Sequence, residues 1–350
     1  MRSGLFDEKF RLERISELGD TLEKINQVVD WSVFTPVLNA AIPRPKYEKG
    51  GRPPYDNLLM FKIILIKRLF NLSFDQTEYQ ITVRLDFMRF LEMSLGDRVP
   101  DAKTIWVYEE TLAKQGTGKD LFALFFEEIK RAGYITREGS IVDASFIEAP
   151  KRKNSKEQRE VLKDGDIPEE WDDTEHPQKL AQRDTDATWT KKGNESHFGY
   201  KDTVKVDLDS KIILDYNITP ANTNDVKAAK GIFDQDDKVA YGDAAYPSLE
   251  LPESVEDRFS KKATRNNPLT EEQKQNNHKK AKLRCRVEHV FAGIVKMVGG
   301  TDIKSKNLQR ASFNISMLNL LYNMRRVVSL QMPTDNWNKR LLRLQRTSIG

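Results

Sequence analysis

Three carboxylates occupy positions where an acidic side chain must be either neutralised or used. Asp143 lies in the middle of the apolar run GSIVDASFIEAP, which has the length of one strand. Asp243 follows the short apolar run KVAY and marks the end of that strand, while Glu288 borders the apolar stripe of a long helix. A carboxylate in apolar surroundings is costly unless it is hydrogen-bonded, paired or bound to a metal. Taken alone, Asp143 is explained as well by backbone amides as by chemistry.

The chemistry becomes specific if the two strands are neighbours and the helix packs across them. Three converging carboxylates repel one another, and a divalent cation removes that repulsion. The chain has a single cysteine, Cys285, and four histidines without metal-ligand spacing, so oxygen ligands favour Mg²⁺ or Mn²⁺ over zinc. Two such ions about 4 Å apart promote in-line displacement at a phosphodiester. The residues therefore suggest a two-metal nuclease site, provided that the strands lie side by side.

Two other acidic residues compete for a chemical role. Asp207 and Asp209 lie near the middle of GYKDTVKVDLDSKIILDYNITP, whose alternation predicts a hairpin. Asp209 precedes Ser210 and is explained by ordinary turn chemistry. Asp207 has no such explanation and remains a second candidate.

The elements that must position these carboxylates follow Gly139. Their expected order is strand, polar insertion, hairpin, helix, strand and helix, which is typical of an α/β fold with a mixed sheet of about five strands covered by helices. The stretch at about 151–198 is polar, lacks apolar periodicity and is interpreted as an extended loop or insertion. Asn224 is expected to cap the helix after the hairpin, and Gly299 to stop the helix that carries Glu288.

Before Gly139 the chain is predicted to be helical. One helix is expected at 8–30, with an apolar stripe that packs on its own domain or, as a second choice, makes a dimer contact. Further helices are expected to begin after Ser73 and after Asp101, each acting as an N-cap. Several short helices fit a helix-turn-helix arrangement, and an ordinary helical bundle explains the same pattern.

Composition narrows the class of protein. The 350 residues are 38% hydrophobic and 31% charged, which is typical of a soluble globular chain of two or three domains. No run approaches the roughly 20 apolar residues of a membrane span, and no signal peptide is recognisable, so a cytoplasmic location is expected. The net charge is only +4, but cations cluster at 151–156 and again at 261–286. Both clusters flank the acidic candidates and indicate a polyanionic substrate.

Taken together, the motifs resemble a known family. IVDASF, AYGDAAY and RCRVEHVF are similar to the three signature regions of DDE transposases encoded by bacterial insertion sequences, in particular the large family numbered five. GRPPYDNLLMFKIILIKRLFNLSFDQTEYQI with PDAKTI resembles the helical N-terminal domain of that family, and DTDATWTKKGNESHFGYKDTVKVD resembles the segment between its two Asp residues. The likeness extends from about Arg52 to Arg326.

The resemblance implies an RNase H-like catalytic core in which Asp143, Asp243 and Glu288 bind two Mg²⁺ ions, with Mn²⁺ as a substitute. It also implies cleavage at transposon ends and joining of 3′-OH ends to target DNA. The expected partner is double-stranded DNA with terminal inverted repeats, and the pairing of two ends calls for a homodimer in the DNA complex. The expected cytoplasmic location is nucleoid-associated. The expected division is a helical segment at 1–46, an all-α DNA-binding domain at 47–135, the catalytic domain at 136–330 and a tail at 331–350.

DNA contacts are expected from the start of the Asp101 helix, from the segment before the hairpin and from the helix of Glu288. The residues are Lys103, Thr104, Trp189, Lys191, Lys192, Arg284 and Lys296. The helix departs from the pattern of related families, because Ala281 replaces a Tyr and Lys296 lies one position later than the corresponding Lys. Two alternatives remain: a transposase-derived protein that binds DNA without cutting it, and an RNase H-like nuclease that does not transpose.

Overall fold

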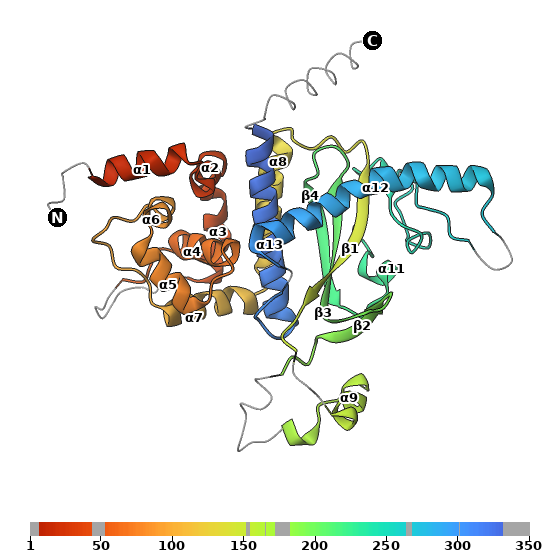
Figure 1. Ribbon diagram of the computed structural model, residues 1–350, viewed down its shortest axis with the longest axis horizontal. Helices are drawn as coiled ribbons and strands as arrows, with labels where there is room; N and C mark the ends of the chain where they lie inside the picture. The colour runs from red at the N-terminus through yellow and green to blue at the C-terminus, as the bar shows by residue number, and fades with distance from the viewer. Residues whose placement is uncertain are drawn as a thin grey trace, which may run out of the picture.

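The computed structural model describes residues 7–43, 53–151, 155–164, 166–171, 183–263, 268–300 and 302–331. The helices of the N-terminal half lie on one side and a sheet lies on the other, with the long helix α13 between them (Figure 1). The expected tail at 331–350 lies outside the described residues apart from Gln331. Within the described residues, no helix is long and apolar enough to cross a membrane.

The N-terminal half is helical, as expected. Its elements are α1 (Asp7–Glu17), α2 (Thr21–Val28), η1 (Trp31–Phe34), α3 (Thr35–Ala41), α4 (Asn57–Leu69), α5 (Phe74–Val83), α6 (Leu85–Leu91), α7 (Ala102–Lys114) and α8 (Gly118–Arg131). Ser73 caps α5 in a capping box, and the side chain of Asp101 accepts a hydrogen bond of 2.7 Å from the Thr104 N–H at the start of α7. Both predicted caps are confirmed.

The single helix predicted at 8–30 is wrong, because the structure has two helices there. Gly19 adopts φ +91°, a conformation that glycine reaches at little cost, and the chain turns at this point. Asp20 then caps α2, since its side chain accepts a hydrogen bond of 2.8 Å from the Leu22 N–H. Only the second part of the stripe packs into the core as expected, because Leu22 and Ile25 are buried whereas Leu18 is 73% exposed.

The second half forms a mixed α/β structure. Its strands are β1 (Ser140–Glu148), β2 (Thr188–Lys192), β3 (Glu195–Asp207), β4 (Ile213–Pro220), β5 (Val239–Tyr241) and β6 (Glu256–Asp257). The helices are α9 (Lys156–Lys163), α11 (Asp225–Ala228), α12 (Glu271–Val298) and α13 (Leu308–Gln331), with the short η2 (Glu169–Trp171). Asn224 caps α11 and Gly299, at φ +76°, ends α12, as predicted.

The sheet order is β4-β3-β1-β5-β6, with β2 as a sixth strand that also pairs with β3. β1, β3 and β4 are antiparallel neighbours, whereas β5 is parallel to β1 and β6 is parallel to β5. A mixed sheet with flanking helices after an all-α region confirms the expected fold class. The predicted hairpin is β3–β4.

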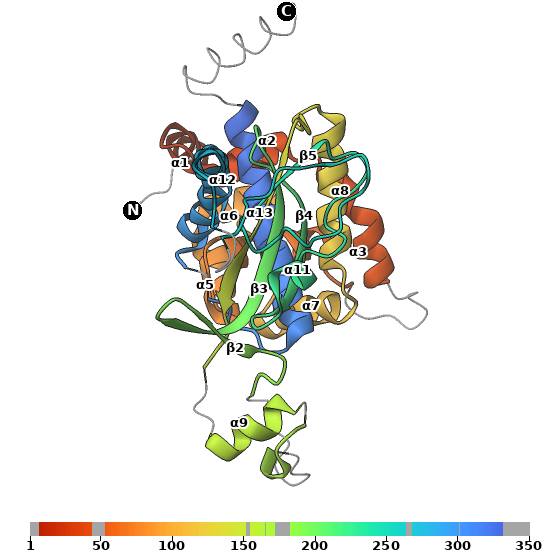
Figure 2. The same ribbon diagram turned by 90° about the vertical axis from the view of Figure 1, so that its right-hand side faces the viewer.

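The extended loop predicted at 151–198 is only partly present. Ser155 and Gln158 form a capping box that starts α9, which projects from the end of the sheet in both views (Figures 1 and 2). Thr188–Lys192 joins the sheet because β3 extends far enough to pair with it, and Trp189 packs on Phe198 with ring centroids 5.1 Å apart. Backbone pairing thus creates a strand where apolar periodicity is weak. Residues 172–182 of this stretch lie outside the described part.

One hydrophobic core crosses both halves. It contains buried residues of α2, α4, α6, α7 and α8 as well as of β1, β3, β4, α12 and α13. α13 contacts α2, α4, α7 and α8 on one side and β3, β4 and α12 on the other. A helix with apolar neighbours all round needs apolar residues on every face, and buried side chains indeed recur along α13 from Ala311 to Leu330. A smaller core covers the opposite face of the sheet around Val142 and Tyr246.

Candidate active site

The pairing of β1 with β5 brings the two aspartates together. The strands are parallel, with Ser140 opposite Ala240 and Ile141 opposite Tyr241. Continuing this register by two residues places Asp143 opposite Asp243, just beyond the end of β5. The expectation that the two strands are neighbours is confirmed, and the geometry explains it: both acidic residues follow an apolar run that is buried in the same sheet.

Asp143 is a partly buried carboxyl whose electrostatic environment is mixed. Burial raises the pKa of Asp143, and the nearby negative charge of Asp243 raises it further. The Ala144 N–H, which donates a 2.9 Å hydrogen bond to Asp143 Oδ1, and the positive charges of Arg284 and Lys192 act in the opposite direction and lower the pKa. The negative charge of Asp243 beside the Asp143 carboxyl favours a bound cation.

Asp243 is held by a tight turn. Its Oδ1 accepts a hydrogen bond of 2.8 Å from the Ala245 N–H. The preceding Gly242 is packed so closely that an added Cβ would lie 2.9 Å from the Phe259 ring and 3.0 Å from the Tyr246 ring. Because these aromatic rings are buried, the glycine fixes where the chain leaves β5. The position of Asp243 therefore depends on the absence of a side chain at residue 242.

Sequence reasoning missed Tyr246. This side chain is buried and 1% exposed, and it packs with Phe259 at a ring-centroid distance of 6.1 Å. Burial raises the pKa of Tyr246, and the charges of Asp143, Asp225 and Asp243 raise it further. The phenol consequently stays protonated beside the acidic pair. The second tyrosine of AYGDAAY, one turn after Asp243, was the available signal.

Helix α12 brings a positively charged side chain, Arg284, to the acidic pair. α12 packs on β1, and Arg284 lies close enough to Asp143 to lower the pKa of that carboxyl. The guanidinium is partly buried, and its Nε has no hydrogen-bond partner among the described residues. Glu288 lies one turn further along α12 with its side chain exposed. Within the described ranges, no group of three or more His, Cys, Asp or Glu side chains is arranged as metal ligands.

The structure explains the competing aspartates as structural residues. Asp207 is fully buried and accepts hydrogen bonds from the backbone N–H groups of Arg137 (3.0 Å) and Ser210 (2.8 Å), and from the Ser210 hydroxyl (2.8 Å). Asp209 pairs with Arg286 at 3.1 Å. Asp207 therefore organises the turn between β3 and β4, which leaves the strand-end pair as the acidic site of the sheet.

The expected DNA-contacting residues lie in three places. Lys191 and Lys192 are exposed on β2 next to Trp189, which is 49% exposed, and Lys192 lies close enough to Asp143 to lower its pKa. Lys296 is exposed in the last turn of α12, two turns beyond Glu288. The remaining pair lies in the N-terminal helical region, where α7 begins with an exposed Lys103 and a partly buried Thr104.

The donor chemistry of the acidic pair suits a hard divalent cation. Asp143 offers carboxylate oxygens from within β1 and Asp243 from just beyond the end of β5, and a bound cation relieves the repulsion between them. The single cysteine of the chain, Cys285, is exposed on α12 and does not form part of the acidic pair. These oxygen ligands fit Mg²⁺ or Mn²⁺ better than zinc.

Family models match most of the chain. The model described as "Transposase DDE domain" matches residues 135–324, and the model described as "Transposase domain (DUF772)" matches residues 10–110. Among solved structures, the chain is similar to a piggyBac transposase in a synaptic complex with hairpin DNA, at 12% identity and a TM-score of 0.40, with 93% of this chain and 75% of that chain covered. DDE transposase domains generally use divalent metal ions. Because the "Transposase DDE domain" model matches more than half of this chain, the chain belongs to the family of DDE-domain transposases.

Proposed function

We propose that this protein is the transposase of a bacterial insertion sequence, of the family numbered five. It binds the ends of its element, cleaves DNA phosphodiesters and joins the 3′-OH ends to target DNA. The observation that carries this proposal is the parallel pairing of β1 with β5, which brings Asp143 beside Asp243 at the end of a central strand. The order of the three motifs in the sequence supports the same assignment.

Asp143, Asp243 and Glu288 are the residues that would hold two Mg²⁺ ions. The chemistry that such ions supply, when bound, is activation of the attacking oxygen and stabilisation of the leaving oxygen. Asp143 and Asp243 provide the fixed part of the site, because Asp143 lies within β1, Asp243 lies just beyond β5, and both strands are paired in the sheet. Glu288 is exposed on α12, one turn from an arginine that interacts with Asp143, and would have to turn toward the aspartates to complete the site.

The chain's own cations position the DNA. Arg284 and Lys192 lie near the acidic pair and would orient a strand whose phosphate is attacked there. Lys191, Trp189 and Lys296 extend this surface along β2 and α12. Lys103 and Thr104, at the start of α7, would contact the element end through the N-terminal region. A transposase has to hold two ends together, so a homodimer is the working form.

The test uses labelled duplex DNA that carries the terminal inverted repeats of the element, incubated with the full chain with and without Mg²⁺. We expect Mg²⁺-dependent nicks at the end junction and joined products, and the same bands with Mn²⁺. Asp143→Asn and Asp243→Asn should remove the nicks while duplex binding persists. Binding without any cleavage by the wild-type protein would leave the DNA-binding alternative, and nicks without joined products would leave the nuclease alternative.

A further inference from the structure

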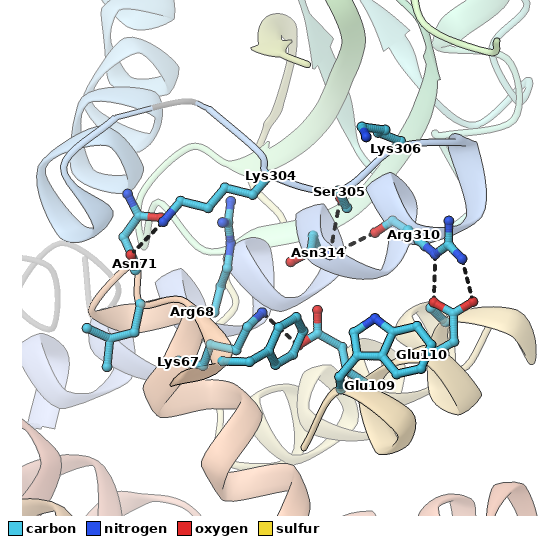
Figure 3. A pocket seen from close by; sticks show the side chains of 14 residues that line it. Lys67, Arg68, Asn71, Glu109, Glu110, Lys304, Ser305, Lys306, Arg310 and Asn314 are labelled. Atoms are coloured by element: carbon cyan, nitrogen blue, oxygen red, sulfur yellow. Dashed lines mark hydrogen bonds and ion pairs between the residues drawn. The ribbon is translucent and has the colours of Figure 1, made fainter. Parts of the chain in front are cut away.

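A second charged site lies at the junction of the helical region and the sheet. It is a pocket of about 340 Å³, lined on one side by the end of α4 and by α7, and on the other by the segment before α13 (Figure 3). Five cationic side chains and two carboxylates line it. The cations are Lys67, Arg68, Lys304, Lys306 and Arg310, and the carboxylates are Glu109 and Glu110. We call this the basic pocket.

Both carboxylates of the basic pocket are already neutralised. Glu109 Oε2 accepts a hydrogen bond of 2.8 Å from Lys67 Nζ, which also lies 4.2 Å from the centre of the Phe74 ring. Arg310 binds Glu110 through two parallel hydrogen bonds of 2.6 and 2.7 Å (Figure 3). The remaining cations of the basic pocket therefore carry a surplus of positive charge.

Arg68 is the centre of that surplus. Its side chain is only 6% exposed, and its Nε and Nη2 have no hydrogen-bond partner among the described residues. Burial lowers the pKa of Arg68 to about 10, and the charge of Glu109 counteracts this effect. An arginine stays charged at neutral pH even with this shift, and leaving its donors unpaired in the protein interior is costly. Such a group indicates an anionic ligand that supplies the missing acceptors.

Two more cations line the pocket from the opposite side. Lys304 is exposed and donates a hydrogen bond of 3.2 Å to the Asn71 carbonyl, which uses one of its three N–H donors. Lys306 is partly exposed and lines the same pocket. These lysines come from the segment after α12, whereas Arg68 comes from the N-terminal helices. An anion in the pocket would thus contact both halves of the molecule.

The form of the pocket points to a nucleotide unit and not to a small ion alone. Trp106 lines the pocket and is 46% exposed, which is unusual for so large an apolar side chain. An aromatic ring beside a cluster of cations offers a stacking surface for a base or sugar attached to a bound phosphate. Arginine forms bidentate hydrogen bonds with phosphate oxygens more readily than with most other acceptors.

We propose that the basic pocket binds a backbone phosphate of the DNA strand on which the protein acts, with Arg68 as the principal donor and Trp106 against the adjoining nucleoside. This inference rests on the proposed function, because it assumes DNA as the partner. It assigns a contact that lies apart from the acidic pair and from the start of α7. DNA bound there would be held by the helical region and by the C-terminal helix segment together.

The main experiment measures duplex affinity by fluorescence anisotropy across a salt series, with the full chain and element-end DNA. Arg68→Gln should weaken binding by about tenfold and reduce the slope of log K against log[salt] by about one. Arg14→Gln is the matched control, since Arg14 is exposed on α1 and pairs only with Glu17 among the described residues. Unchanged affinity and slope for Arg68→Gln would overturn the assignment.

Stability separates binding from folding. Arg68→Gln removes a buried charge whose Nε and Nη2 lack a hydrogen-bond partner in the described part of the chain, so its thermal midpoint in the absence of DNA should equal or exceed that of the wild type. If Arg68→Gln fails to fold, Lys306→Ala provides the same test from the pocket rim, with a smaller loss of affinity and a similar change in slope. Wild-type affinity in Lys306→Ala as well would reject the pocket.

Two further measurements identify the source of the phosphate. Inorganic phosphate should raise the thermal midpoint of the wild type more than that of Arg68→Gln. Trp106→Ala should retain this effect but bind duplex more weakly, which would identify a DNA strand as the source of the phosphate. Full duplex affinity in Trp106→Ala would assign the pocket to a free phosphate and overturn the DNA assignment. If the wild type cleaves ends and the pocket variants bind normally, only this inference fails. If the wild type neither binds nor cleaves, the proposed function fails.

Discussion

The acidic pair and the basic pocket each hold a charged side chain that folding removes from water, negative in the acidic pair and positive in the basic pocket. At the sheet, Asp143 is partly buried beside a like charge, so its pKa is raised. At the helical junction, Arg68 is buried with two nitrogens unpartnered among the described residues, so its pKa is lowered. Each region keeps a charge that folding alone does not satisfy. In the proposed function the negative site takes a divalent cation, and in the further inference the positive site takes a DNA phosphate.

The largest effect should come from removing the third carboxylate of the proposed acidic site. Glu288→Gln keeps the size of the side chain but removes one negative charge, and we expect DNA cleavage to fall by about a thousandfold. Glu272→Gln is the matched control, because Glu272 is also exposed on α12 but lies four turns earlier. Cleavage rates at saturating duplex measure both. Equal rates for the two variants would confine the acidic site to the aspartates.

Asp202, a buried carboxyl that has no part in the proposed site, is a reference for the effect of burial on the pKa of an acidic group. Burial raises the pKa of Asp202 to about 7, while the hydrogen bond from Asn319 and the charge of Lys119 oppose the shift. The folded state therefore holds a proton that the unfolded chain releases, so stability should fall as pH rises from about 4 to about 7.

Asp202→Asn should abolish that part of the pH dependence and stabilise the protein at pH 8 by a few kcal/mol. Urea unfolding at pH 5 and pH 8 measures the difference, since each shifted pKa unit corresponds to about 1.4 kcal/mol. A variant with the wild-type pH profile would show that Asp202 titrates normally.

The turn that carries Asp243 should respond to a single methyl group. Gly242→Ala places a Cβ 2.9 Å from the buried Phe259 ring, so the turn must shift and carry Asp243 away from Asp143. We expect cleavage to fall by about ten- to a hundredfold, with a loss of about 1–3 kcal/mol in the free energy of unfolding. Gly96→Ala is the control, because nothing lies within 4 Å of the added Cβ there. Duplex affinity should be unchanged in both.

The smallest effect is a difference in the salt dependence of duplex binding between variants of the basic pocket and of the acidic pair. Lys304→Ala in the basic pocket should reduce the salt slope of duplex binding by about one and lower affinity a few-fold. Asp143→Asn should leave the slope as it is or raise affinity slightly, since it removes a negative charge near the strand. The same anisotropy titrations serve for both variants. A slope that changes equally in both would mean that the two regions do not differ in their phosphate contacts.

The neighbouring position of Asp143 and Asp243 could be predicted from sequence because its signals are local. IVDAS and AYGDA each carry an Asp directly after buried apolar residues, and the parallel pairing of their strands places the two aspartates side by side. The caps Ser73, Asp101 and Asn224 were readable for the same reason, since each acts on its own next turn.

The rest depends on contacts between distant segments. Arg68 belongs to an apolar helix in the sequence, and only the fold brings it to Lys304 and Trp106. Strand β2 was not predicted because Thr188–Lys192 has little apolar alternation and depends on pairing with β3. The break at Gly19 required a backbone angle that the apolar stripe does not show. Tertiary context decided all three.

Helix α13 has a consequence for how the molecule can be taken apart. It shares apolar surface with the N-terminal helices and with the sheet, so neither half has a complete interior of its own. We expect a fragment that begins at residue 136 to expose the face of α13 that α4, α7 and α8 cover, and to aggregate. Heat or urea should melt the chain in a single transition. The N-terminal helices and the sheet therefore depend on each other for folding. New end-recognition helices grafted onto this sheet would have to bring their own apolar surface to cover α13.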